Sequence, residues 1–318
     1  MSCQTDPTVD CVFKAILGKE ENKNLLIHFL NAVLEPPAEE KITEVLIMNP
    51  YNEREFEADK LSIVDIRAKD GMDNNYQVEI QIALHANLPP RMLYMWSSVY
   101  RSLLNKGESY SLLTPVISIW ILTGTLFPET GDCHLAFMAW NQKHNIVLCD
   151  HFAIHVLQLP EWRKSSAGII EKDRWMYFFR EGKNTDTDEE PPKILNTDEM
   201  RQAMSVIKDF SENQKNYLLY QDRLAALSEI ATWRAEVEQA QKEKQEAVKK
   251  AEKAEEKAKK EKEKAIKEIK EAEKKAEKKA KKEKEKAIKE AEEKAKKEKE
   301  KLLLLLKKAG IDPEQAEQ

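Results

Sequence analysis

The sequence contains no apolar run long enough to cross a membrane. Its longest purely apolar stretch near the C-terminus, residues 302–306, is five leucines, whereas a spanning helix needs about 20 apolar residues. The first 20 residues carry charges and no apolar run of the length that a secretory signal peptide needs. We therefore expect a soluble, cytoplasmic protein that does not insert into a membrane.

Cysteine is scarce and forms no metal-binding or disulfide pattern. The four cysteines, Cys3, Cys11, Cys133 and Cys149, show no C-x-x-C spacing, and we interpret them as reduced thiols. Cys133 and Cys149 each have a histidine within two residues. Neither pair has the spacing of a zinc finger, so we do not predict a zinc site there.

Acidic and basic residues are unevenly distributed along the chain. Residues 241–300 contain 25 Lys and 18 Glu but no Asp or Arg, a local balance of +7. The whole chain has 52 basic and 57 acidic residues, so the remainder holds 27 and 39, a balance of −12. An acidic body argues against nucleic-acid binding by attraction over the whole surface. An enzyme acting on nucleic acid would need a local basic groove, metal ions or help from this basic tail.

The first 235 residues mix strand and helix patterns, which indicates an α/β or α+β architecture. Two short helices are expected within residues 10–34. Strands are expected where apolar residues alternate or run continuously, at 44–50, 59–69, 76–82, 115–122, 134–140 and 151–159. Asp70-Gly71 predicts a hairpin turn between the second and third of these. Further helices are expected at 87–106, with Leu93, Trp96, Tyr100 and Leu103 on one face, at 175–180, and from residue 197 onward.

Two carboxylates lie on neighbouring strands of the expected hairpin. Glu79 and Gln81 share one strand face because residues two apart point the same way, and Asp65 lies on the preceding strand. If the strands pair, Asp65 and Glu79 converge, and a hard divalent cation would relieve their repulsion. Such an ion could lower the pKa of a bound water and stabilise charge on a phosphate. The alternative is that these residues form the solvated side of an amphipathic hairpin, and spacing alone favours that interpretation.

Five segments in order extend over more than 100 residues, from Asp10 to Leu122. They are DCVFKAILG, LLIHFLNAVL, DKLSIVDIRAKDG, YQVEIQI and RMLYMWSSVYRSLLNKGESYSLLTPVISIWIL. Together they resemble the Rpn family of recombination-promoting nucleases and transposases, within the PD-(D/E)XK nuclease superfamily. The resemblance implies an α/β core of the restriction-endonuclease type, a mixed sheet flanked by helices, followed in this chain by a long charged helix. It also implies metal-dependent cleavage of DNA phosphodiester bonds.

The resemblance assigns roles to particular residues of this sequence. Asp65 matches the acidic residue of the second core strand, while Glu79 and Gln81 match the first and last positions of the E-x-K motif. The backbone carbonyl of Ile80 is then a further ligand for Mg²⁺, with Mn²⁺ or Ca²⁺ as other ions of suitable chemistry. Asp10 is a possible contributor from the first helix, although an Asp at a helix start is often only a cap.

Gln81 departs from the superfamily pattern, which has lysine at this position. A neutral amide can position a water but brings no charge, so the metal must do more, or Lys14 or Lys60 must substitute. The alternative is that both lysines are ordinary solvated side chains. Arg91 matches an R-x-x-Y piece of the family and is a candidate phosphate contact, because its planar fork suits phosphate oxygens.

The C-terminal third is a low-complexity segment without glycine or proline between residues 237 and 301. KAKKEKEK occurs three times, and Glu–Lys pairs four apart support a helix directly. We expect a nuclease-like body at 1–235, a Lys/Glu/Ala-rich helical or weakly coiled-coil tail at 236–301, and a short segment at 302–318. The apolar stripe is mostly alanine, so an isolated charged helix is favoured over a stable zipper.

The leading hypothesis is a Mg²⁺-dependent DNA endonuclease, linked to recombination or mobile elements. A rival is a catalytically degenerate relative that acts in DNA binding or assembly through its fold and tail, as Gln81 and the acidic body favour. A third is a structural coiled-coil protein, which predicts a stable dimer of the tail alone. DNA is the expected partner, and a homodimer through body or tail is a further expectation.

Overall fold

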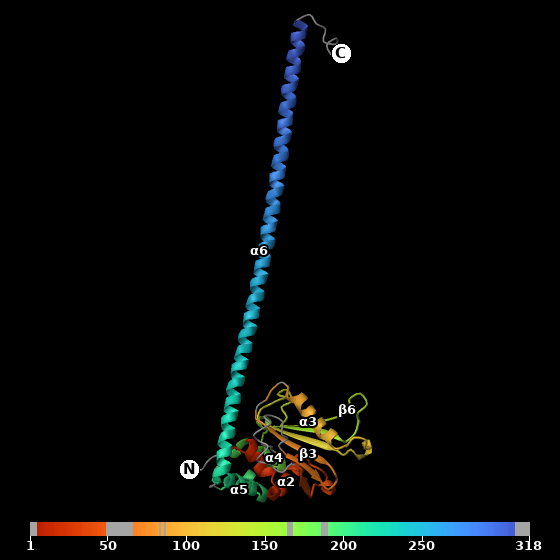
Figure 1. Ribbon diagram of the computed structural model, residues 1–318, viewed down its shortest axis with the longest axis vertical. Helices are drawn as coiled ribbons and strands as arrows, with labels where there is room; N and C mark the ends of the chain where they lie inside the picture. Colours follow the sequence, from red (N-terminus) through yellow and green to blue (C-terminus); the bar gives the residue numbers. More distant parts are fainter. Residues whose placement is uncertain are drawn as a thin grey trace. The chain divides into compact units, whose positions relative to one another are not determined.

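The computed structural model describes residues 5–48, 66–82, 84–85, 87–163, 168–185 and 190–308, and their ribbon is drawn in Figure 1. The chain divides into two compact units, one ending at Trp233 and the other beginning at Arg234. The first unit holds the sheet and its flanking helices, and the second is helical.

A six-stranded mixed sheet in the order β1-β2-β3-β4-β8-β5 forms the centre of the first unit. The first three strands pair antiparallel, the central β3, β4 and β8 run parallel, and β5 is antiparallel to β8. Their bounds are β1 Val45–Ile47, β2 Ile66–Asp70, β3 Asn75–Gln81, β4 Val116–Leu122, β5 His134–Met138 and β8 Phe152–Gln158. The predicted mixed sheet flanked by helices is confirmed. A separate small hairpin of β6 (Trp140–Asn141) and β7 (Ile146–Val147) was not predicted.

The β2–β3 turn is organised by Asp70 rather than by the adjacent glycine. One oxygen of its carboxylate accepts hydrogen bonds from the backbone N–H groups of Met72 and Asn74, both at 2.9 Å. Asp73 is the residue with a left-handed backbone, at φ 68°. The Asp70 side chain thus closes the hairpin that the sequence predicts, in the manner expected for aspartate in turns.

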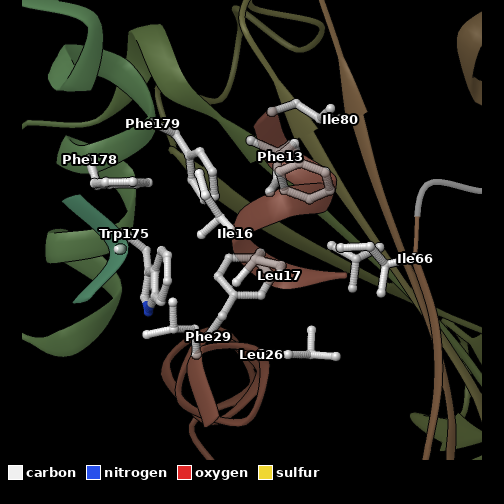
Figure 2. Close-up of a cluster of buried hydrophobic side chains, with 14 of the residues drawn as sticks. Phe13, Ile16, Leu17, Leu26, Phe29, Ile66, Ile80, Trp175, Phe178 and Phe179 are labelled. Atoms are coloured by element: carbon white, nitrogen blue, oxygen red, sulfur yellow. The ribbon is translucent and has the colours of Figure 1, made fainter. Parts of the chain in front are cut away.

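Helices cover both faces of the sheet, and Figure 1 shows α3 on one side and α2 and α4 on the other. The larger core lies on the second side, where the four helices α1 Asp10–Leu17, α2 Lys23–Leu34, α4 Glu171–Glu181 and α5 Asp198–Glu212 contribute buried side chains. Figure 2 shows Phe13, Phe29, Trp175 and Phe179 converging there with Ile66 and Ile80 of the strands.

The helix α3, Leu88–Ser102, forms a second and smaller core with β4 and β8. Its buried residues are Leu88, Met92, Met95 and Val99. The predicted face was wrong by about one position, since Leu93 is exposed while Trp96 and Tyr100 are only partly buried. Trp96 lies at the edge of this core and donates its indole N–H to the Val116 carbonyl at 2.8 Å. Trp96 has an apolar ring and a polar N–H, so the sequence pattern assigned it to the buried face although it lies at the edge of the core.

The final helix, α6 Gln214–Lys308, is continuous over 95 residues and confirms the predicted long charged helix. Its N-terminal part belongs to the first unit, where Tyr220 is buried. In the second unit the large apolar residues Ile266, Ile269 and Ile288 are all exposed. Glu–Lys pairs four apart stabilise this stretch, as between Lys242 and Glu238 at 2.7 Å.

Candidate active site

Three polar residues alternate along β3 with residues of the larger core. Val78 and Ile80 enter that core, so Gln77, Glu79 and Gln81 point to the opposite face. Glu79 lies beside Trp120 in the parallel β3–β4 register, and Trp120 belongs to the core beneath α3. The polar row therefore lies on the α3 side of the sheet, and Glu79 and Gln81 share this face, as their two-residue spacing predicted.

This row is not a solvated surface. Glu79 is 3% exposed and Gln77 is 0% exposed, so the interpretation of Glu79 as part of a solvent-facing hairpin side is wrong. Burying a carboxylate costs free energy unless it is paired, hydrogen-bonded or bound to a metal. A buried carboxylate on a central strand is a candidate functional group.

Gln77 belongs to the same row and was missed by the sequence analysis. Its amide nitrogen donates a hydrogen bond to a carboxylate oxygen of Glu79 at 3.2 Å. Its amide oxygen is buried and has no hydrogen-bond partner among the described residues. The signal was present in the sequence, because Gln77 is two residues before Glu79 and must share its face. An orphaned buried oxygen next to a buried carboxylate is what a cation or an ordered water would satisfy.

Arg91 brings a positive charge to the last position of the motif. From the first turn of α3 it donates a hydrogen bond to the side-chain oxygen of Gln81 at 3.2 Å. Its guanidinium also lies over the Trp120 ring, 5.8 Å from the centroid, in the geometry of a cation–π interaction. The structure therefore brings together Gln81 and Arg91, to which the sequence patterns had assigned separate roles.

Two of the predicted site residues, Asp65 and Lys60, lie outside the described residues. Their roles stay predictions. In the sequence Asp65 directly precedes Ile66, the first residue of β2. Ile66 pairs with Val78, the neighbour of Glu79. Ile80 is buried on β3, and a role for its carbonyl as a metal ligand is likewise a prediction.

The residues predicted from the first helix have different surroundings. Asp10 is the first residue of α1, accepts a hydrogen bond from the backbone N–H of Cys11 at 2.8 Å, and pairs with Arg223 of α6 at 3.4 Å. Lys14 is only 7% exposed, so its interpretation as an ordinary solvated lysine is wrong. The helix that carries both residues packs into the core on the Val78 and Ile80 face.

Among the described residues no group of three or more His, Cys, Asp and Glu side chains is placed to hold a metal ion. Asp65, the predicted partner of Glu79, lies outside the described residues, and the carboxylate pair stays a prediction. No described helix is long and apolar enough to cross a membrane.

Comparison with known proteins adds to this geometry. No significant match was found among curated proteins or among solved structures. A family model, described as PD-(D/E)XK nuclease family transposase, matches residues 7–240. This match covers more than half of the chain and includes the whole sheet with the Gln77–Glu79–Gln81 row. The chain belongs to the PD-(D/E)XK nuclease family transposases.

Proposed function

We propose that the protein is a metal-dependent DNA endonuclease that hydrolyses phosphodiester bonds, in a process linked to recombination or mobile elements. The observation that carries the proposal is the buried carboxylate of Glu79 on a central strand. It lies in one row with the orphaned oxygen of Gln77 and with Gln81, which holds Arg91. In this proposal, residues up to about 235 are the nuclease domain, and the charged tail is a separate helical part.

The residues of this row fit a hard divalent cation. Mg²⁺ and Mn²⁺ prefer carboxylate, carbonyl and water oxygens, and Glu79 offers a carboxylate beside the unpartnered Gln77 oxygen. The predicted carboxylate of Asp65 and carbonyl of Ile80 would complete the set. When bound, such an ion lowers the pKa of a coordinated water and stabilises negative charge on the phosphate.

The remaining residues bind and orient the substrate. Arg91 carries a permanently charged fork that suits two phosphate oxygens at once. Its hydrogen bond to Gln81 holds that fork at the end of β3. Gln81, with both donor and acceptor atoms, can orient a water beside the phosphate. Arg91 thereby provides the positive charge that the motif's lysine would supply.

The rival function is a catalytically degenerate DNA-binding or assembly protein. The neutral Gln81 and the acidic charge of the chain outside the tail favour it. It predicts DNA binding without cleavage under any metal. The contact of Arg91 with Gln81 favours the enzyme, because the charge missing from the motif is restored from α3.

Cleavage of supercoiled plasmid by the full chain tests the proposal. Nicking is expected with Mg²⁺ or Mn²⁺ and not with EDTA, and it should be lost in Asp65→Asn and Glu79→Gln. Glu129→Gln is the matched control, because Glu129 is exposed and lies outside the polar row. DNA binding by folded wild-type protein without nicking in either metal would select the degenerate protein. Nicking that survives both site substitutions would contradict the assigned site.

A further inference from the structure

A cavity of about 390 Å³ lies where the three parallel strands end. Ile82 follows the last residue of β3, Thr123 that of β4, and Leu159 that of β8. Ligands of open α/β sheets characteristically bind outside the carboxyl ends of the strands. The cavity is therefore beside the end of the strand that carries Glu79 and Gln81, although Gln77, Glu79, Gln81 and Arg91 do not line it.

Two cationic side chains, Arg180 and Lys183, line this cavity. Arg180, from the last turn of α4, donates to the Trp162 carbonyl and the Glu181 carboxylate through Nη1 and Nε, at 2.8 and 2.9 Å. These bonds and the stacking on Trp162, at 5.6 Å, fix the guanidinium. Its Nη2 makes no hydrogen bond to another described residue. Lys183, exposed in the turn after α4, adds a second cation and forms no ion pair within the described chain.

Asp6 and Thr123 add hydrogen-bond acceptors to the lining. One carboxylate oxygen of Asp6 accepts from the backbone N–H and the hydroxyl of Thr8, at 2.8 and 2.6 Å. The second oxygen of Asp6 makes no hydrogen bond to the described residues. The Thr123 hydroxyl donates to the Ile82 carbonyl at 2.8 Å, which leaves its lone pairs for a ligand donor. Ile82, Leu159 and Phe179 add apolar surface to the lining.

We propose that this cavity binds one nucleotide unit, with its phosphate at Arg180 and Lys183 and its base towards Asp6 and Thr123. A nucleotide combines an anion, an apolar sugar face and base N–H donors, which matches the cations, apolar wall and acceptors in that order. The volume lies within the range of about 300–1,000 Å³ typical of small-ligand pockets. The assignment of this unit to the DNA substrate rests on the proposed nuclease function, whereas the binding of a nucleotide does not.

Binding of thymidine 5′-monophosphate to the full chain in EDTA, measured by calorimetry, tests the site apart from any metal. Saturable binding is expected, with thymidine and inorganic phosphate each about 10-fold weaker, because each lacks one set of contacts. Lys183→Glu should weaken binding about 10-fold or more. Lys143→Glu makes the same charge change at an exposed lysine in the β6–β7 turn and should leave binding within about 2-fold.

Arg180→Lys keeps the charge but removes the guanidinium fork, and it should weaken binding if thermal unfolding shows an intact fold. No saturable binding by folded wild-type protein, or equal effects of Lys183→Glu and Lys143→Glu, would overturn the proposal. If Lys183→Glu also weakens the binding of a 5′-phosphorylated tetranucleotide, the ligand is part of a DNA strand. If Lys183→Glu weakens only the binding of the mononucleotide, the ligand is a free nucleotide. Nucleotide binding by a protein that never cleaves DNA would refute the nuclease while leaving this site in place.

Discussion

Replacing Arg91 by alanine is expected to slow DNA cleavage while leaving the protein folded. The guanidinium lies 3.2 Å from the Gln81 side-chain oxygen and over the Trp120 ring. Loss of one preorganised donor aimed at the reacting group costs about 10²–10³-fold in rate, or ~2.7–4 kcal/mol of transition-state stabilisation. The hydrogen bond and the cation–π contact together stabilise the fold by only about 1–2 kcal/mol. For a unit of this size that lowers the Tm by about 2–8 °C.

A second substitution separates charge replacement from general damage. If Arg91 stands in for the missing lysine of the motif, Gln81→Lys in the Arg91→Ala background should recover about 10-fold or more of the lost rate. Arg101→Ala is the control, because Arg101 is exposed on the same helix and should leave the rate unchanged. The assay is single-turnover cleavage of a labelled duplex at saturating Mg²⁺, with DNA affinity measured separately in EDTA.

Two results would refute this reasoning about Arg91. An Arg91→Ala rate equal to that of Arg101→Ala would remove Arg91 from the site. A slow Arg91→Ala variant that Gln81→Lys does not improve, and that has lost DNA affinity in proportion, would assign Arg91 to DNA binding alone.

Other perturbations test the site, the core and the tail. Mg²⁺ at ten times its Kd should stabilise the wild-type protein by about 1.4 kcal/mol, and differential scanning fluorimetry should show no such shift for Glu79→Gln. Trp175→Ala removes a buried ring that stacks on Phe179 and meets Phe29 edge-on. It should cost about 3–5 kcal/mol in urea denaturation; a loss below 1 kcal/mol would contradict the packing. Burial, and then the nearby Lys172 ammonium, lower the pKa of His134 and His155 to about 4 from the ordinary 6.5. Because the folded state keeps both rings neutral, their contribution to stability is complete above pH 6.5 and is lost as the pH falls towards 4. The free energy of unfolding should drop over that pH window. The variant with both His134→Gln and His155→Gln should show a flatter dependence of this free energy on pH, which checks the assignment. The isolated charged tail should be helical by circular dichroism yet monomeric in sedimentation, because its stripe is mostly alanine; a concentration-dependent dimer would favour a coiled coil.

The regular elements of the body were predictable because their sequence patterns are local. The continuous apolar run of β4 reflects burial on both faces of that strand. β3 alternates polar and apolar residues although both of its faces are buried. The predicted face of α3 was wrong because Leu93 and Met92 are both apolar, and only the position of the sheet decides which is buried. Periodicity specifies a stripe to within about one residue and no better when apolar residues are adjacent.

The candidate site was predicted in part, for similar reasons. Two-residue spacing placed Glu79 and Gln81 on one face, but it cannot show that α3 buries that face. The contact of Arg91 with Gln81 depends on how the first turn of α3 meets β3, which no local pattern encodes. The same holds for the cavity at the strand ends, whose residues come from five separate segments between Asp6 and Lys183. The predicted pairing of Asp65 with Glu79 stays a prediction.

The most direct test of the proposed chemistry is cleavage of a short duplex in water enriched in heavy oxygen, followed by mass spectrometry of the new strand ends. With Mg²⁺ the wild-type protein should yield a terminal phosphate that carries one heavy oxygen, and Glu79→Gln should yield no product. Absence of any product from folded wild-type protein, or equal incorporation by both proteins, would contradict a hydrolytic site built on Glu79.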